Sequence, residues 1–378
     1  MVYDCLFPWT VGGAERWTRN VAEALAADGH EVTYLTRLQW DPGEEPDLPG
    51  IRVIPVSGRD ELYGGDGNRA IAPALRFGRG VARHLLTHRG AYDVVHVSAS
   101  PFFGLLAAGL ARRAGGYRLA ADWHEVWSEE YWREYLGAAK GRVAFGVQRS
   151  CARFPQQAFC FSAMHAERLR EEGLRGEPIV LRGEWAGPTD RPVPRPAEPL
   201  VVFAGRMIPD KHAPDVVPAV VAARRTIGDL RAVIFGDGPQ LGDVRAAIAR
   251  HGAQDYIEAP GFVDEDRVQE TLARATCLLL PSTREGYGMI VIEAAAKGVP
   301  SVLVAAPDNA SVEHIDPGVN GFVAPDGSAD ALAAAIVAAH DGGPALREAT
   351  ADWFAAHADE LSLRTSLQRV VAAYNAMR

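Results

Sequence analysis

Residues 276–298 read TCLLLPSTREGYGMIVIEAAAKG and combine a strand, a glycine loop and a helix in that order. The apolar run TCLLLPS has the length of a short buried strand, and Gly286 and Gly288 follow it directly. Apolar strands without alternation are typical of parallel sheets that are covered on both faces. The small residues AAAKG that follow favour a helix with a glycine stop. The stretch therefore predicts one strand–loop–helix unit of an α/β fold.

The same alternation occurs in two series, separated by residues 187–199, GPTDRPVPRPAEP, which hold five prolines. The first series starts with VYDCLF from Val2 and the second with LVVFAGR from Leu200. We expect an α/β protein with two Rossmann-like domains facing a central cleft. The expected boundaries are an N-terminal Rossmann-like domain over 1–186, a semi-rigid linker over 187–199, a C-terminal Rossmann-like domain over 200–350, and C-terminal helices over 351–378 that pack back on the first domain.

Composition excludes several classes of function. The chain has 378 residues, with 39 basic and 48 acidic side chains and a net charge of -9, which disfavours nucleic-acid binding. Its four cysteines are scattered and form no metal or redox pair. No apolar run is long enough to span a membrane, and the N-terminus lacks a basic signal start. We expect a cytoplasmic protein. Weak contact with the inner face of the membrane stays open, although no basic amphipathic stretch requires it.

The loop and helix over 284–294 suit an anion and a polyhydroxylated group. Gly286 and Gly288 let the backbone approach a ligand closely, and a helix start presents free N–H groups to a diphosphate. The amides expected to face the diphosphate belong to Tyr287, Gly288, Met289 and Ile290. Glu293, in an apolar setting that is poor for an idle charge, could accept both hydroxyls of a ribose. Glu285 could face the hydroxyls of a sugar.

Two other stretches of the second series support this ligand. Arg206 ends the strand that opens the series and Lys211 follows five residues later, so two cations could neutralise a diphosphate leaving group. Gly236 and Gly238 form a Gly-Asp-Gly turn that misses the dinucleotide fingerprint, because its third glycine comes one position late. This turn either lines the cleft or has no ligand contact.

In the first series, Gly12 and Gly13 open space at a helix start, for a phosphate or substrate or simply as a tight turn. His124 follows a predicted strand within an aromatic-rich segment and could bond a sugar hydroxyl. His96 also ends a strand and is equally consistent with a structural and a site role. No metal site is expected, since the acids over 264–266 resemble a helix start. No P-loop or nucleophile elbow occurs.

The sequence resembles the retaining glycosyltransferases of family 4 (glycosyl transferases group 1), which have the two-domain GT-B fold. EGYGMIVIEA matches the E-x7-E motif of that family, GRMIPDKH its Gly-Arg…Lys motif and FGDGP its Gly-Asp-Gly turn. VGGAER matches its N-terminal glycine loop, and GVNGFVAPDGSADALAAAI its late segment. The resemblance covers essentially the whole chain. One departure is His212, where the family usually has glycine.

The resemblance implies a nucleotide-diphosphate sugar as donor, a retained anomeric configuration, and neither a metal nor another cofactor. It also implies that the domain over 1–186 binds the acceptor and that the domain over 200–350 binds the nucleotide sugar. Arg206 and Lys211 would then neutralise the departing diphosphate, and Glu293 would bind ribose. Glu285 would hold the donor sugar, with His124 beside the transferred group. The base would lie near Phe262 and Val263. The acceptor, the base and the oligomeric state stay open.

Two other functions remain as alternatives. One is a sugar-nucleotide epimerase or another non-transferase enzyme on the same fold, such as a phosphorylase. The phosphorylase is disfavoured because nothing suggests a lysine held for a pyridoxal cofactor. The other is a catalytically idle nucleotide-binding module, which would tolerate Glu285→Ala without loss of function.

Overall fold

Val2 lies in the middle of the first sheet of the computed structural model, which describes residues 1–10, 12–62 and 69–377. It forms parallel bridges to Leu35 on one side and Val97 on the other. The Val2 N–H donates to His96 O at 2.7 Å, and the Tyr3 N–H donates to Leu35 O at 3.1 Å. These residues join a two-stranded and a four-stranded parallel ladder into one sheet.

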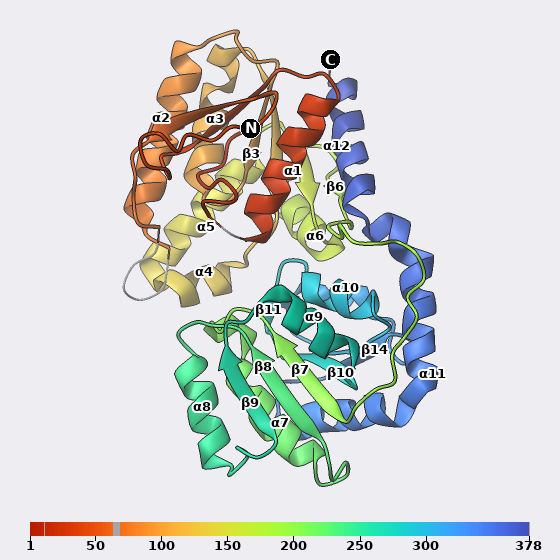
Figure 1. Ribbon diagram of the computed structural model, residues 1–378. Helices are drawn as coiled ribbons and strands as arrows, with labels where there is room; N and C mark the ends of the chain where they lie inside the picture. Colours follow the sequence, from red (N-terminus) through yellow and green to blue (C-terminus); the bar gives the residue numbers. More distant parts are fainter. Residues whose placement is uncertain (11, 63–68, 378) are drawn as a thin grey trace. The chain divides into compact units, whose positions relative to one another are not determined.

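The chain divides into two compact units, shown in Figure 1. Unit 1 comprises Met1–Gly183 and Leu363–Arg378, and unit 2 comprises Glu184–Ser362. The elements of unit 1 are α1 (Gly13–Ala27), β1 (Val32–Arg37), β2 (Ile51–Ser57), α2 (Ile71–Thr87), β3 (Val94–Ser98), α3 (Phe102–Gly115), β4 (Arg118–Trp123), α4 (Glu129–Leu136), α5 (Ala138–Ala152), β5 (Gln157–Cys160), α6 (Ala163–Glu171), β6 (Ile179–Val180) and α12 (Leu363–Ala376).

The expected strand over 2–7 reduces to the bridges at Val2. The Asp4 carboxylate instead binds Arg69, and the Cys5 carbonyl accepts the Tyr34 hydroxyl at 2.9 Å, so the chain leaves the sheet here. When Val2 is included, the strands of the sheet have the order β2, β1, Val2, β3, β4, β5, β6, and all pairs are parallel. The order reverses between Val2 and β3, and this is the topological switch point of a Rossmann-like sheet.

Helices cover both faces of this sheet. Val95 and Val97 point into the core formed with α2, α3, α5 and α6, whereas His96 points to the opposite face and bonds Tyr374 of α12. Helix α1 lies beside α12 on that opposite face (Figure 1). Its buried residues Trp17, Val21 and Leu25 recur every fourth position, the spacing of one helical face.

Unit 2 holds a six-stranded parallel sheet of order β14, β12, β10, β7, β8, β9. Its elements are β7 (Leu200–Ala204), η1 (Pro209–Lys211), η2 (Ala213–Asp215), α7 (Val216–Ala223), β8 (Arg231–Phe235), α8 (Leu241–Arg250), β9 (Ile257–Gly261), α9 (Glu265–Ala273), β10 (Cys277–Leu280), β11 (Arg284–Glu285), α10 (Met289–Ala295), β12 (Ser301–Val304), β13 (Asp308–Asn309), η3 (Ala310–His314), β14 (Gly321–Ala324) and α11 (Ala329–Leu361).

The strand order of unit 2 positions its loops. The first strand, β7, lies centrally, and β8 and β9 add on one side before the chain returns to place β10 on the other. In Figure 1, α7 and α8 cover one face of the sheet, and α9 and α10 cover the other. The switch point therefore lies between β7 and β10, and ligands of such sheets bind beyond the carboxyl ends of the strands there.

The unit boundary differs from the boundary expected at residue 350. Helix α11 bends at Gly343, where φ is 51° and Pro344 follows, and continues to Leu361 within unit 2. The reason is that Trp353 Nε1 donates to Asp316 Oδ2 at 2.6 Å, while the Phe354 ring packs edge-on against Trp185. Of the C-terminal helices that were expected to pack on the first domain, only α12 belongs to unit 1.

The proline-rich segment 187–199 has no helix or strand and belongs to unit 2. Arg191 attaches it to α11, with ion pairs of 2.6 Å to both Glu348 and Asp352. Among the described residues, no helix is both long enough and apolar enough to cross a membrane.

We expect Val2→Asp to destabilise unit 1 by about 4 kcal/mol, because it places an unpaired carboxylate in the middle of a covered sheet. Val2 is 1% exposed, whereas Val193 in the proline-rich segment is 87% exposed. Val193→Asp is the matched control and should change stability by less than about 0.5 kcal/mol. Urea unfolding measures both, and equal midpoints for the two variants would contradict the central position of Val2.

Candidate active site

Two loops meet at the switch point of unit 2. One follows β7 and contains η1, and the other follows β10 and contains β11. The Thr283 N–H donates to Asp210 O at 3.0 Å, and the Arg284 guanidinium pairs with the Asp210 carboxylate. The loops that carry Lys211 and Glu285 are therefore held together.

Glu285 is the most enclosed carboxylate of this edge, with 8% of its surface exposed. Lys211 Nζ forms an ion pair with Glu285 Oε1, and Ser282 Oγ donates to the same oxygen at 3.0 Å. The structure thus brings together two of the predicted site residues. A buried carboxylate needs a partner, and Lys211 supplies it through Oε1, whereas the second oxygen, Oε2, is left out of this ion pair.

The predicted cation Arg206 lies at the carboxyl end of β7. Its side chain is exposed, and it forms no ion pair with any of the described residues. Lys211 is half-buried. The edge therefore offers one solvent-facing guanidinium and one ammonium already paired with a carboxylate.

Glu293 lies half-buried on α10, and Gln269 Nε2 donates to its Oε2 at 2.5 Å. Lys297, one turn later, is also near this carboxylate. Burial lowers the pKa of Lys297, and the charge of Glu293 opposes that shift.

Glycine is required at the Gly-Asp-Gly turn because the backbone of the β7 loop lies against it. A Cβ at Gly236 would lie 1.8 Å from Gly205 O, and one at Gly238 would lie 2.7 Å from Met207 O. Both residues also have positive φ, 130° and 145°. The turn thus has a structural role beside Arg206. Whether it also contacts a ligand stays a prediction.

The loop of the E-x7-E stretch is held from behind by a short parallel ladder, in which β11 pairs with β13. Asn309 is 1% exposed; its Nδ2 donates to Ser282 O at 3.1 Å and to Val304 O at 2.9 Å. Its Oδ1 accepts the Ser311 N–H at 3.2 Å and the Ser311 hydroxyl at 2.5 Å. Asn309 thereby fixes the strand end that carries Ser282, which in turn bonds Glu285.

Gly288 lies against this support. Its φ is 88°, and a Cβ there would lie 2.5 Å from Ser311 Cβ. Tyr287 points back into unit 2, where its hydroxyl accepts the Glu184 N–H at 3.4 Å and its ring meets His314 edge-on at 4.7 Å. Met289 and Ile290 begin α10 and are half-buried, as is Gly286.

The residues expected near a base lie at the end of β9. Phe262 is 81% exposed, which is unusual for a large apolar side chain, and Val263 is half-buried. An exposed aromatic ring at the carboxyl edge of the sheet can stack on a planar group.

In unit 1, His124 follows β4, and its ring stacks on Phe161 at 4.3 Å. Burial lowers the pKa of His124, although Asp122 and other carboxylates oppose the shift. His124 Nε2 is buried without a hydrogen-bond partner among the described residues. The ring is therefore neutral at pH 7 and retains bonding capacity for a ligand.

The contacts of His96 give it a structural role. It is 1% exposed, with Nδ1 2.9 Å from the Tyr374 hydroxyl and Nε2 2.9 Å from Asp122 Oδ1. Asp122 Oδ2 accepts Trp17 Nε1 at 2.9 Å. These contacts fasten α1 and α12 to the sheet.

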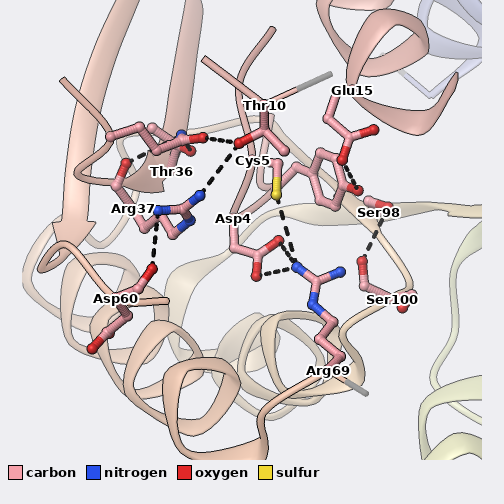
Figure 2. A network of polar contacts seen from close by, with 12 residues as sticks. Asp4, Cys5, Thr10, Glu15, Thr36, Arg37, Asp60, Arg69, Ser98 and Ser100 are labelled. Carbon is pink, nitrogen blue, oxygen red and sulfur yellow. Dashed lines mark hydrogen bonds and ion pairs between the residues drawn. The ribbon is translucent and has the colours of Figure 1, made fainter. Parts of the chain in front are cut away.

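A second polar network lies at the carboxyl edge of unit 1, near its own switch point (Figure 2). Arg69 Nη2 lies 2.7 and 2.5 Å from the two carboxylate oxygens of Asp4, which is 1% exposed. Burial alone would lower the pKa of Arg69, but the Asp4 charge outweighs it and raises the pKa. Arg37 lies beside this pair and bonds Thr10 Oγ1 and the Asp60 carbonyl, each at 3.3 Å.

The predicted glycine loop precedes this network. Helix α1 begins at Gly13 after Gly12, and a Cβ at Gly12 would lie 2.3 Å from Glu15 Oε2. The Tyr3 hydroxyl donates to Glu15 Oε1 at 3.2 Å. A carboxylate therefore already covers the positive end of α1, and Glu15 would have to turn aside for a phosphate to approach Gly12 and Gly13.

Comparison with known proteins identifies the family. The family model described as "Glycosyltransferase Family 4" matches residues 11–181, and the one described as "Glycosyl transferases group 1" matches residues 198–341. A glycogen synthase from Mycobacterium tuberculosis is 27% identical over 320 residues, which span 78% of this chain and 75% of that protein. An alpha-D-kanosaminyltransferase from Streptomyces kanamyceticus is 29% identical over 41% of this chain and 39% of its own length.

Solved structures agree on the fold. Sucrose-phosphate synthase from Thermosynechococcus elongatus superposes with a TM-score of 0.78 at 19% identity, covering 97% of this chain and 94% of that one. HepE from Anabaena, solved with UDP and glucose, gives 0.70 at 18% identity over 99% and 98%.

Two Rossmann-like parallel sheets and these matches define a glycosyltransferase of the GT-B class. The chain belongs to the glycosyltransferases of family 4 and group 1, as the sequence motifs predicted.

Sequence reasoning placed Ser282 at the strand end in the cleft but assigned it no role, and it missed Asn309 and Ser311. Ser282 lies three residues before Glu285, so its role was predictable from that position. Asn309 and Ser311 belong to the segment PDNAS, 307–311, which has no periodicity and bonds the loop only through the β11–β13 ladder.

We expect Gly288→Ala to cost at least about 2 kcal/mol, because the new Cβ meets Ser311 and the backbone has positive φ. Gly242→Ala in α8 is the matched control, since nothing lies within 4 Å of a Cβ there. It should be neutral or stabilising, as alanine favours a helix. Thermal unfolding of both variants tests this, and a stable Gly288→Ala would show that the loop conformation is wrong.

His212 has φ 51°, the left-handed conformation that glycine adopts freely, and it keeps this conformation without being glycine. Its Nδ1 lies 3.0 Å from Asp215 Oδ2, and this hydrogen bond raises the pKa of His212. We expect His212→Gly to be about 1 kcal/mol more stable than His212→Ala, since only glycine relieves the backbone. Both variants lose the Asp215 contact, so their difference in urea midpoint isolates the backbone effect. Equal midpoints would contradict it.

A raised pKa means that the His212–Asp215 contact is fully present below pH about 6.5 and is lost as the pH rises through the higher folded-state pKa. The free energy of unfolding of wild type relative to that of His212→Gly should therefore fall as the pH rises from 6 to 8. A relative free energy of unfolding that rises over this pH range would contradict the His212–Asp215 contact.

Proposed function

We propose that the protein is a retaining glycosyltransferase that moves a sugar from a nucleotide-diphosphate sugar, UDP- or GDP-linked, to an acceptor hydroxyl without a metal. The observation that carries the proposal is the Lys211–Glu285 ion pair at the switch point of unit 2, beside the exposed Arg206. Family membership and neighbours solved with UDP and a sugar, such as HepE and a pneumococcal O-GlcNAc transferase, support this donor class.

Arg206 and Lys211 stabilise the negative charge of the diphosphate leaving group. As the bond between the anomeric carbon and the phosphate oxygen breaks, negative charge grows on the diphosphate. Arg206 is exposed and can bind two phosphate oxygens with its planar guanidinium. Lys211, held by Glu285, supplies a second positive charge at a fixed position, so little reorganisation is needed when the charge develops.

The two glutamates orient the donor. Glu285 has Oε1 engaged by Lys211 and Ser282, so Oε2 is the oxygen to accept hydroxyls of the donor sugar. Glu293 accepts the ribose hydroxyls on α10, and Gln269 holds its carboxylate. The Phe262 ring stacks on the base. Asn309 positions Glu285 through Ser282 and touches no substrate.

The acceptor hydroxyl is the nucleophile and attacks the anomeric carbon from the face that the phosphate leaves, which retains the configuration. The departing phosphate oxygen takes the proton of the hydroxyl, so no separate general base is required. His124, neutral because burial lowers its pKa, accepts or donates a hydrogen bond to the transferred sugar without adding charge.

The test of the donor site is a thermal-shift panel of UDP, GDP, ADP and dTDP. One nucleotide at about one hundred times its Kd should stabilise wild type by roughly 2.7 kcal/mol. Glu293→Ala should abolish the shift, since the ribose loses its acceptor. Asp229→Ala removes an exposed carboxylate before β8, at the amino edge of the sheet, and should keep the shift. Loss in both variants, or no shift in wild type, would contradict the assignment.

Transfer itself is tested with the sugars of that nucleotide. Glu285→Gln should lower kcat by about a hundredfold or more while the nucleotide shift remains. The coupling of the anomeric proton in the product, compared with the donor, tests retention, and chelation should leave the rate unchanged. A rearranged nucleotide sugar formed without any acceptor would favour the epimerase instead.

A further inference from the structure

Arg37 ends β1 at the carboxyl edge of the unit 1 sheet, and its guanidinium is only partly engaged (Figure 2). It is half-buried and forms no ion pair with any described residue. Two of its five N–H groups donate to neutral oxygens, Thr10 Oγ1 and the Asp60 carbonyl. Its Nε is buried without a hydrogen-bond partner among the described residues. Such a group requires an explanation, because burying a cation without a full set of partners costs free energy.

Two carboxylates near Arg37 already have other partners. Asp4 binds Arg69 through both of its oxygens. The Asp60 carboxylate binds Arg76, with contacts of 2.6 and 3.1 Å, so Asp60 offers Arg37 only its backbone carbonyl. The charges of these two pairs cancel, and the charge of Arg37 is left over.

A third carboxylate, Glu15, faces the start of α1. It accepts the Tyr3 hydroxyl at 3.2 Å, and its Oε2 is the atom that a Cβ at Gly12 would meet. Arg16, in the first turn of the same helix, offsets its charge. Arg16 is exposed, lies over the Phe7 ring at 5.3 Å and forms no ion pair with any described residue. This edge therefore keeps an excess positive charge on a chain whose net charge is -9.

The guanidinium of Arg37 is held in a fixed place. The Thr10 hydroxyl that accepts from it donates to Gln39 Oε1 at 2.7 Å, and the same oxygen accepts the Leu6 N–H at 3.2 Å. Gln39 Nε2 in turn donates to Thr36 Oγ1 at 3.0 Å. A guanidinium that is already oriented binds the oxygens of a phosphate or a carboxylate with little further loss of side-chain freedom.

We propose that Arg37 binds an anionic group of the acceptor, a phosphate or a carboxylate, so that the acceptor is a hydroxylated molecule bearing a negative charge. This substrate class rests on the proposed function, which assigns the donor diphosphate to Arg206 and Lys211 of unit 2 and leaves the Arg37 site for the second substrate. A single guanidinium held between two loops suits one discrete oxyanion, whereas an extended polyanion is bound by a row of cations.

The experiment is a thermal-shift titration of the full chain with sodium phosphate and, separately, with sodium acetate. Sodium chloride keeps the ionic strength constant, and each titration is run with and without the stabilising nucleoside diphosphate at saturation. Wild type should show a saturable rise in Tm that persists with the nucleotide present. Arg37→Gln should weaken the apparent affinity for the anion by at least about tenfold, the usual effect of removing a hydrogen bond to a charged group. The anion that binds more tightly identifies the group.

Three further variants locate the anion. Arg52→Gln removes an exposed arginine that forms no ion pair with a described residue, at the amino end of β2 and thus at the opposite edge of the same sheet. It should keep the response to the anion, and so should Arg206→Gln in unit 2. Arg37→Lys keeps the charge without the planar fork and should recover part of the affinity. Circular dichroism confirms that each variant is folded.

A structural role for Arg37 predicts a different result. Arg37→Gln would then lower the Tm without any ligand and leave the response to phosphate and acetate unchanged, which would overturn the proposal. Equal responses to the anion in Arg37→Gln and Arg52→Gln, or no saturable response in wild type, would do the same. Loss of the response when the nucleotide saturates would assign Arg37 to the donor instead.

Transfer assays test the acceptor itself. An acceptor that wild type uses should carry the anionic group, and Arg37→Gln should raise its KM by at least about tenfold with a smaller effect on kcat. A neutral acceptor used equally well by wild type and Arg37→Gln would overturn the proposal. Failure of the proposed function is distinguishable, because it removes the nucleotide shift and transfer, whereas the anion titration without nucleotide still compares Arg37→Gln with Arg206→Gln.

Discussion

The ion pair between Lys211 and Glu285 is the interaction on which the carboxyl edge of unit 2 depends. It joins the loop after β7 to the loop after β10, and these are neighbours only because the strand order reverses between them. Each charge makes the burial of the other tolerable, since a lone carboxylate at 8% exposure would be strongly destabilised. The second bridge, between Arg284 and Asp210, and the Thr283–Asp210 hydrogen bond hold the same two loops in register.

Close approach of backbone segments is the other constraint on this edge. Gly236 and Gly238 let the Gly205–Met207 loop lie against the β8 turn, and Gly288 lets the β11 loop lie against Ser311. The glycine spacing was readable from the sequence, but the reason for it was not, because the contacts join residues about 20 to 30 positions apart. His212 shows the limit of such reasoning, as a position can keep the left-handed backbone without glycine.

The sequence predicted the α/β class, the two Rossmann-like halves and the family, since apolar strands and glycine loops are local signals. It did not predict that Val2 alone completes the first sheet, that α11 stays in unit 2 as far as Leu361, or that Asn309 supports Glu285. Those depend on long-range pairing.

The Tyr374–His96 contact has a consequence for how the protein is made. It joins residues 278 positions apart, and it ties α12 to the first sheet. The chain enters unit 2 at Glu184 and leaves it after Ser362, so during synthesis the whole of unit 2 emerges before α12 does. Unit 2 can therefore complete its contacts on the ribosome, while the unit that starts first must wait, with the α12 side of its sheet uncovered, until unit 2 has been synthesised and α12 has followed it.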